Sequence, residues 1–256
     1  MKPPTKSRLD QLLVDRGLVE SRARAQALVI AGCVFKGEQR LDKPGMSVPV
    51  DASIEVRGQD HPWVSRGGLK LTHGLDRFSI DPAGRICIDV GASTGGFTDV
   101  LLARGASRVY AVDVGHGQLA WKLRQNPCVT VLERTNARYL TVDQVPEPVD
   151  LVVCDASFIG LQTVLPAAMA LTDPNSAALV ALIKPQFEVG RERVGKGGVV
   201  RDPELHAEVC DRIVQWVGGQ PDWSVLGVTE SPIKGPEGNV EFLIGAVRGR
   251  KAADAG

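Results

Sequence analysis

The segment Ile86–Thr98, which reads I-C-I-D-V-G-A-S-T-G-G-F-T, decides the fold of this chain. Residues 86–90 form a short apolar run of the kind that makes a buried strand. Gly91 to Gly96 form a glycine-rich turn, and residues 97–103 continue at helical spacing. A strand, a tight turn and a helix N-terminus leave free backbone N–H groups that converge on one point. The segment therefore predicts a binding site for a polar ligand.

The turn differs from the pattern that binds dinucleotides. Ser93 stands where G-x-G-x-x-G requires a glycine, and Asp89, just before the turn, would repel a pyrophosphate. A second apolar run, R-V-Y-A-V-D, ends in Asp113, about 20 residues beyond the glycines, which is the spacing of a carboxylate that binds ribose hydroxyls. These features suit an adenosine, an ammonium and a sulfonium, and so predict S-adenosylmethionine. The alternative is a strand–helix turn without a ligand.

Each part of this cofactor has an expected set of contacts. The glycine turn is expected to hold the methionine portion and Asp113 the ribose. Asn136, in the loop after the third strand, is a candidate for the adenine, although it could equally be a turn residue. The cofactor-binding residues expected are Asp89, Gly91, Ser93, Thr94, Gly95, Gly96, Phe97, Asp113 and Asn136.

Composition narrows the class of protein. The 256 residues suffice for one large and one small domain. The 30 basic and 30 acidic residues balance, so nucleic-acid binding would depend on local patches. Scattered cysteines without a C-x-x-C pair and dispersed histidines predict neither disulfides nor a metal site. The N-terminus lacks the apolar core of a signal peptide, and the apolar stretch 156–182 is interrupted. We expect a cytoplasmic monomer without membrane contact.

Apolar strands and helical segments alternate from residue 85 onward. This alternation predicts an α/β fold with a doubly wound parallel sheet and ligands at the carboxyl ends of its strands. The final strand pair, interrupted by prolines and glycines, resembles the antiparallel end of the seven-stranded class I methyltransferase sheet. The expected strands are 86–90, 109–113, 129–132, 151–154, 178–183, 225–229 and 240–247, and the expected helices are 97–103, 118–124, 163–171 and 203–217.

The first 58 residues carry a different pattern, in which Ser7 and Ser21 begin two short helical segments. The strings R-L-D-x-x-L and S-R-x-x-A-Q-x-L resemble the S4 RNA-binding module, a small α+β domain that docks on structured RNA. This resemblance implies phosphate contacts, and the alternative is that the arginines only solvate a helical hairpin. The implied contacts are Arg8, Arg22, Arg24 and Lys43. We expect an S4-like domain at 1–58, a linker at 59–64, a catalytic domain at 65–248 and a tail at 249–256.

Four charged residues are predicted at strand ends or on an adjacent element. Asp155 and Lys184 each follow an apolar strand, Glu241 opens the last strand, and Lys70 lies on the helix before the first strand. Buried charges require partners, so two lysines and two carboxylates would satisfy one another in one cleft. The alternative is a set of surface ion pairs.

These residues match the K-D-K-E tetrad of the FtsJ-like RNA ribose 2′-O-methyltransferases. With the strings Q-L-A-W, E-R-T-N-A-R and K-P-Q-F-E-V-G, the chain resembles the TlyA (hemolysin A) family nearly end to end. The resemblance implies methylation of cytidine 2′-hydroxyls in ribosomal RNA of the large subunit and, in some members, also of the small subunit.

A physical argument divides the roles within the tetrad. Methyl transfer from a sulfonium is an in-line displacement, and a ribose hydroxyl is a poor nucleophile until its proton is taken. We expect Lys184 to be the base and Asp155 to orient it. Lys70 is expected to favour the neutral form of Lys184 and to bind phosphate or the developing alkoxide, and Glu241 to orient Lys70 and the ribose.

The segment 187–202 is rich in glycine and basic residues and follows Lys184. It could close over RNA as a lid, or it could be a mobile surface loop without RNA contacts. Further RNA-binding candidates are Arg66, Arg191, Arg193 and Lys196.

Three rival functions remain. A base methyltransferase would carry Asp/Asn-Pro-Pro-aromatic after the fourth strand, where this chain has D-A-S-F. A non-catalytic ribosome-assembly factor would not need the tetrad. A cytolysin, which the name hemolysin suggests, is disfavoured by the missing membrane span and secretion signal.

Overall fold

A computed structural model describes residues 6–16, 18–19, 21–56, 61–235 and 238–249. The chain divides into two compact units, residues 1–62 and 63–256. Residues 59–60 of the expected linker (59–64) and residues 250–256 of the expected tail (249–256) lie outside the described residues, as does the side chain of Arg191.

The first unit packs two helices against short strands. Helices α1 (Leu9–Asp15) and α2 (Arg22–Ile30) bury Leu9, Leu13 and Val29 completely. The Ser21 side chain caps α2 by accepting a hydrogen bond from the Arg24 N–H at 3.2 Å. The strands form two antiparallel sheets, β1 (Lys6–Arg8) with β4 (Ser47–Pro49), and β2 (Val34–Lys36) with β3 (Gln39–Arg40) and β5 (Glu55–Val56).

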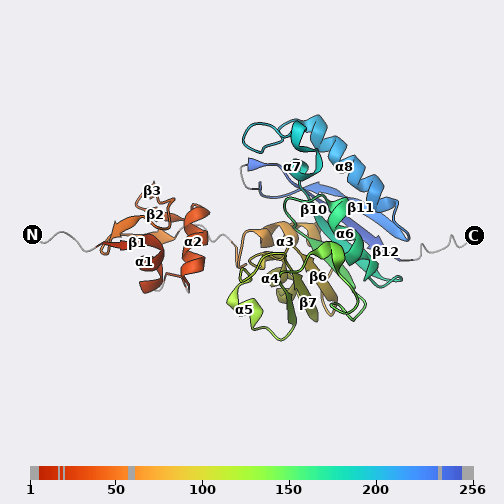
Figure 1. Cartoon of the computed structure of the whole chain (residues 1–256), viewed down its shortest axis with the longest axis horizontal. Helices are drawn as coiled ribbons and strands as arrows, with labels where there is room; N and C mark the ends of the chain where they lie inside the picture. The colour runs from red at the N-terminus through yellow and green to blue at the C-terminus, as the bar shows by residue number, and fades with distance from the viewer. Residues whose placement is uncertain (1–5, 17, 20, 57–60, 236–237, 250–256) are drawn as a thin grey trace, which may run out of the picture. The chain divides into compact units, whose positions relative to one another are not determined.

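The second unit is built on a seven-stranded sheet with the order β11-β12-β10-β9-β6-β7-β8 (Figure 1). Strand β12 pairs antiparallel with both of its neighbours, β10 and β11, and every other neighbouring pair in this sheet is parallel. The expected class I methyltransferase sheet is thereby confirmed. The strands are β6 (Ile86–Val90), β7 (Arg108–Val112), β8 (Val129–Leu132), β9 (Leu151–Cys154), β10 (Ala177–Ile183), β11 (Trp223–Glu230) and β12 (Phe242–Arg248).

Helices cover both faces of this sheet, because alternate residues of each buried strand point to opposite sides. Residues Cys87, Val153 and Val180 pack with α3 (Gly67–Phe78) and α4 (Gly96–Ala103). Ile88 and Val152 pack on the other side with α6 (Leu161–Ala170) and α8 (Pro203–Gly218). Shorter elements are α5 (Trp121–Arg124), η1 (Ala137–Tyr139), α7 (Pro185–Glu188) and η2 (Arg191–Arg193).

The register of β12 brings the end of the chain back to the functional edge of the sheet. Ile183, the last residue of β10, pairs with Phe242, the first residue of β12. Glu241 therefore comes just before β12, rather than opening it as expected, and lies at the edge where Lys184 follows β10. Among the described residues, no helix is long and apolar enough to cross a lipid bilayer.

Candidate active site

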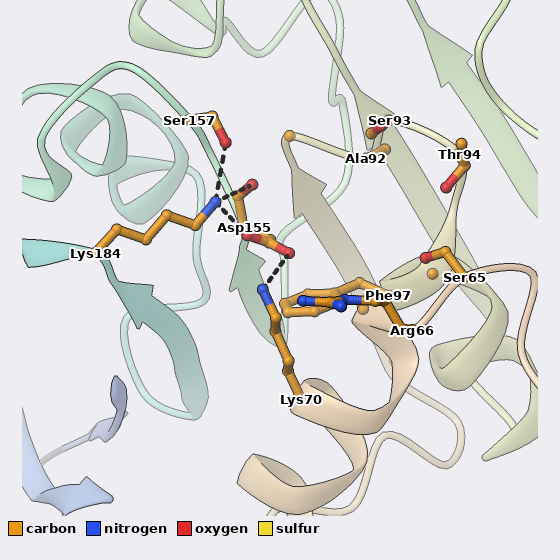
Figure 2. A pocket seen from close by; sticks show the side chains of 13 residues that line it. Ser65, Arg66, Lys70, Ala92, Ser93, Thr94, Phe97, Asp155, Ser157 and Lys184 are labelled. Carbon is orange, nitrogen blue, oxygen red and sulfur yellow. Dashed lines mark hydrogen bonds and ion pairs between the residues drawn. The ribbon is translucent and has the colours of Figure 1, made fainter. Parts of the chain in front are cut away.

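The two lysines and two carboxylates of the tetrad lie together at the carboxyl ends of β9 and β10. Lys184 Nζ is 2.6 Å from Asp155 Oδ1, and Lys70 Nζ is 3.8 Å from Asp155 Oδ2 (Figure 2). Lys70 Nζ also donates a hydrogen bond to Glu241 Oε2 at 2.7 Å. The order Glu241–Lys70–Asp155–Lys184 thus forms one chain of alternating charge.

Three of the four side chains in this row of alternating charges are almost completely buried. The side chains of Lys70, Lys184 and Glu241 are 7%, 8% and 0% exposed, whereas Asp155 is 20% exposed. Buried charges persist only when they are paired, and each member here has an opposite charge beside it. Asp155 is the member most open to solvent, so a substrate entering the pocket meets the centre of the chain.

The glycine turn forms the opposite wall of the same pocket. Gly91, Ser93, Thr94, Gly96 and Phe97 line it. Gly91 and Gly95 have φ of +83° and +97°, which residues with a Cβ rarely adopt. A Cβ at Gly91 would lie 2.9 Å from the Ala156 Cα, so the turn approaches the loop after β9 closely. The turn and the tetrad therefore share one cavity.

Asp89 lies beneath the turn and is fully buried. The Thr98 hydroxyl donates a hydrogen bond to Asp89 Oδ2 at 2.7 Å, but Oδ1 is buried without a hydrogen-bond partner among the described residues. Desolvation raises the pKa of the Asp89 carboxyl to about 7. An unpartnered carboxylate oxygen of this kind fits a cationic group of a ligand.

Four of the predicted cofactor residues do not line the pocket around the tetrad, namely Asp89, Gly95, Asp113 and Asn136. The Asp113 carboxylate accepts hydrogen bonds from the backbone N–H groups of Ser93 at 2.8 Å and Gly115 at 2.7 Å, so it is tied to the glycine turn. The Asn136 side chain caps η1 by accepting from the Arg138 N–H at 3.1 Å. Asp113 thus has a fixed orientation beside the turn, whereas Asn136 serves a local turn.

Ser157 and Phe158, in the loop after β9, were not predicted from the sequence as functional residues. The Ser157 hydroxyl accepts a hydrogen bond from Lys184 Nζ at 3.0 Å and lines the pocket. Phe158 is 90% exposed, has φ of +64°, and lies 5.0 Å from the ring of Phe187. A largely exposed phenylalanine in a left-handed conformation costs free energy and provides no core packing. The string D-A-S-F contains both residues but does not reveal their exposure.

The basic residues predicted to bind RNA have different surroundings. Arg66 lines the pocket and donates a hydrogen bond to the Lys234 carbonyl, whereas Arg193 is paired with Glu208 of α8. Lys196 is exposed within the segment 187–202. That segment is anchored by the buried side chain of Asn239. Its Nδ2 donates a hydrogen bond to the Gly198 carbonyl at 3.0 Å, and its Oδ1 accepts one from the Val200 N–H at 3.1 Å.

The basic residues of the first unit lie at its surface. The side chains of Arg8 and Arg22 are about half exposed, and both bond the carboxylate of Asp10. Arg24 is half-buried, and Lys43 is exposed. Among the described residues, no group of three histidine, cysteine or acidic side chains could hold a metal ion.

A class I methyltransferase sheet, a glycine turn after its first strand, and a lysine–carboxylate chain at the same edge define the class of this protein. It is a class I methyltransferase. Residues 63–248 match the family described as FtsJ-like methyltransferase, and residues 7–54 match the S4 domain. The chain belongs to the FtsJ-like methyltransferases, and within them to the TlyA (hemolysin A) family.

Named relatives support this assignment. The chain is 49% identical over 243 residues to the 16S/23S rRNA (cytidine-2'-O)-methyltransferase TlyA of Mycobacterium tuberculosis, covering 93% of this chain and 89% of the relative. It is 38% identical to Hemolysin A of Brachyspira hyodysenteriae, covering 92% and 98%. The solved structure called "Putative hemolysin from Streptococcus thermophilus" is 42% identical, with a TM-score of 0.73, covering 96% of this chain and 89% of that one.

Proposed function

We propose that this protein transfers a methyl group from S-adenosylmethionine to the 2′-hydroxyl of a cytidine in ribosomal RNA. The observation that carries the proposal is the row of ion pairs from Glu241 through Lys70 and Asp155 to Lys184, which faces the glycine turn across one pocket. The relative from M. tuberculosis is named for the same chemistry on 16S and 23S rRNA. Large-subunit RNA is the expected substrate, and small-subunit RNA is the second substrate to be tested.

Lys184 is the group that takes the proton of the hydroxyl. Its Nζ is held between the Asp155 carboxylate at 2.6 Å and the Ser157 hydroxyl at 3.0 Å, so its direction is fixed before a substrate enters. To act as the base, Lys184 must first release its own proton to solvent, because an ammonium paired with Asp155 cannot accept another. With S-adenosylmethionine bound, the hydroxyl oxygen would then receive the methyl group as the hydroxyl proton passes to the neutral Lys184.

Lys70 and Glu241 stabilise the site rather than exchange a proton. Lys70 is bonded to the buried Glu241 at 2.7 Å and faces Asp155 at 3.8 Å. A fixed cation beside the reacting oxygen stabilises the negative charge that develops on it during proton transfer. Glu241 keeps that cation in place, because a buried ammonium without a partner is strongly destabilising.

The residues present fit S-adenosylmethionine, which supplies an electrophilic methyl group when bound. The unpartnered Oδ1 of Asp89 would receive the ammonium of its amino-acid portion. Asp113 retains acceptor capacity for ribose hydroxyls besides the two N–H groups that fix it. The turn from Gly91 to Gly96 would allow close approach of the methionine portion.

The proposal is tested by identifying the product. Unmodified ribosomal RNA and purified subunits are incubated with the protein and S-adenosylmethionine, and the digested nucleosides are separated by mass spectrometry. We expect 2′-O-methylcytidine. Methylation on the base would indicate a base methyltransferase instead, and no methylation of free RNA or of either subunit would refute the proposal.

A further inference from the structure

Asp10 in the first unit is a buried carboxylate that two half-exposed arginines share. Its side chain is 0% exposed, whereas those of Arg8 and Arg22 are 52% and 50% exposed. Arg8 donates from Nε to Asp10 Oδ1 at 3.0 Å and from Nη2 to Oδ2 at 2.9 Å. Arg22 donates from Nε to Oδ2 at 3.0 Å. A planar guanidinium held along one edge has its other N–H donors in fixed directions.

The carboxylate of Asp10 is fully committed within the unit. The Gln11 N–H donates to Oδ1 at 3.0 Å and Gln26 Nε2 to Oδ2 at 2.9 Å, besides the three bonds from the arginines. These hydrogen bonds, that of Arg8 foremost, hold the pKa of Asp10 well below its usual range. Asp10 therefore stays ionised near neutral pH, and its place in the interior keeps it from touching a macromolecular ligand.

The charges of this cluster do not balance. Two guanidinium groups face one carboxylate, which leaves one positive charge uncompensated among the described residues. Arg22 uses only Nε toward Asp10, and among the residues that the structure describes no acceptor meets its two terminal nitrogens or Nη1 of Arg8. A phosphodiester carries one negative charge and two free oxygens. It would neutralise the excess charge and accept hydrogen bonds from both arginines.

We infer that Asp10 is a positioning residue, which holds Arg8 and Arg22 as a preformed clamp for one RNA phosphodiester. This inference rests on the proposed function, because that function makes RNA the ligand. If Asp10 contributed only its negative charge and did not position the arginines, the opposite effect on RNA affinity would be expected. Replacing Asp10 by a neutral residue adds net positive charge to the unit and would strengthen RNA binding.

The sign of the change in affinity separates these two expectations. The dissociation constant of the full-length protein for unmodified ribosomal RNA transcribed in vitro is measured over a range of salt concentrations. We expect Asp10→Asn to bind about tenfold more weakly, which corresponds to the loss of about one charge-assisted hydrogen bond. The slope of log K against log salt is expected to fall by about 0.7 to 0.9, the contribution of one phosphate. The kcat at saturating RNA is expected to remain unchanged.

A double-substitution cycle tests whether Asp10 acts through the arginine. Arg22→Lys keeps the charge but loses the planar fork, so it is expected to weaken binding several-fold. The variant carrying both Asp10→Asn and Arg22→Lys is expected to bind no more weakly than Asp10→Asn alone. Arg40→Lys, an exposed residue of β3 outside the cluster, is the matched control and is expected to bind like the wild type.

Several results would overturn the inference. Tighter or unchanged binding by Asp10→Asn would do so, as would losses that multiply in the double variant or an equal loss in Arg40→Lys. If Asp10→Asn does not fold, Arg8→Lys and Arg22→Lys leave the carboxylate in place. In that case the double variant Arg8→Lys/Arg22→Lys is compared with the two single variants. Because both arginines contact one phosphate, its loss of RNA affinity must be smaller than the product of the two single losses. A loss equal to that product would contradict the clamp. A wild-type protein that binds RNA but transfers no methyl group would refute the proposed function alone, because the cycle depends only on binding.

Discussion

Asp89 and Asp113 are two acidic residues beside one glycine turn, yet their surroundings differ. Asp113 is half-buried and accepts two backbone N–H groups, whereas Asp89 is fully buried with one oxygen unpartnered. Both could be predicted as cofactor ligands from their positions in the sequence. Only the structure shows that Asp89 carries a desolvation cost that a bound cation would relieve.

This desolvation cost predicts that the free energy of unfolding depends on pH, because Asp89 titrates at a different pH in the folded and the unfolded protein. Its pKa is raised to about 7 in the folded protein from the usual 3.8 of an aspartate, so the wild type loses stability as the pH rises through that range. Asp89→Asn mimics the protonated acid and avoids this loss. Without cofactor, the variant is expected to be more stable than the wild type, by roughly a few kcal/mol at pH 8 and by less at pH 5.

Urea unfolding at the two pH values measures this difference, and the KM for S-adenosylmethionine supplies a second readout. The KM is expected to rise about tenfold in Asp89→Asn, because one charged contact is lost. A difference in stability that is the same at pH 5 and pH 8 would contradict the account of Asp89.

At the scale of elements, the turn after β6 and the loop after β9 touch each other and shape the pocket. A Cβ at Gly91 would meet the backbone of Ala156 at 2.9 and 3.0 Å, and backbone cannot move as a flexible side chain can. Gly91→Ala is therefore expected to displace Asp155 as well as the turn. We expect the affinity for S-adenosylmethionine and the kcat both to fall at least tenfold.

Gly84→Ala is the matched control for this substitution. Gly84 has a similar φ of +73°, but a Cβ there would meet nothing within 4 Å. It carries only the conformational cost, on the order of 1 kcal/mol, and should retain activity. Equal loss of activity in the two variants, measured by calorimetry and steady-state kinetics, would show that the contact with Ala156 is unimportant.

The loop after β9 also presents Phe158 beside Ser157, which contacts Lys184. An exposed aromatic ring in this position is suited to stack on a nucleobase, an interaction that contributes about 1 to 3 kcal/mol. Phe158→Ala is expected to raise the KM for RNA at least fivefold without changing the KM for S-adenosylmethionine or the melting temperature. Trp121→Ala, which also removes an exposed ring, is the control. An unchanged KM for RNA in Phe158→Ala would exclude stacking.

At the scale of the whole molecule, the fold was more predictable than the site. The strands β6, β8 and β9 have the predicted bounds. For β6 and β9 the reason is that buried parallel strands appear in a sequence as continuous apolar runs, whereas β8 is half-buried along its whole length. The helix expected at 118–124 begins only at Trp121, since residues before it belong to the loop after β7. Propensity alone does not reveal where a loop ends.

Charges at strand ends pointed to the tetrad, because the carboxyl ends of parallel strands share one edge of a sheet. Asp10, Ser157 and Phe158 were not predicted as functional residues. Their importance depends on burial, on a hydrogen bond to a distant lysine and on a left-handed backbone, and each of these arises from tertiary packing. Pairing and exposure of this kind are properties of the fold and cannot be read from neighbouring letters.

The central claim is that Lys184 takes the proton of a ribose hydroxyl in this pocket. It is tested most directly by single-turnover methyl transfer to ribosomal RNA at saturating RNA and S-adenosylmethionine. Lys184→Met, which keeps the length of the side chain, is expected to react about 10² to 10⁴ times more slowly, with both dissociation constants within about twofold of the wild type. Lys122→Met, at a lysine that is 58% exposed and paired with Asp99, is expected to react at the wild-type rate. Transfer by Lys184→Met at the wild-type rate would contradict the account.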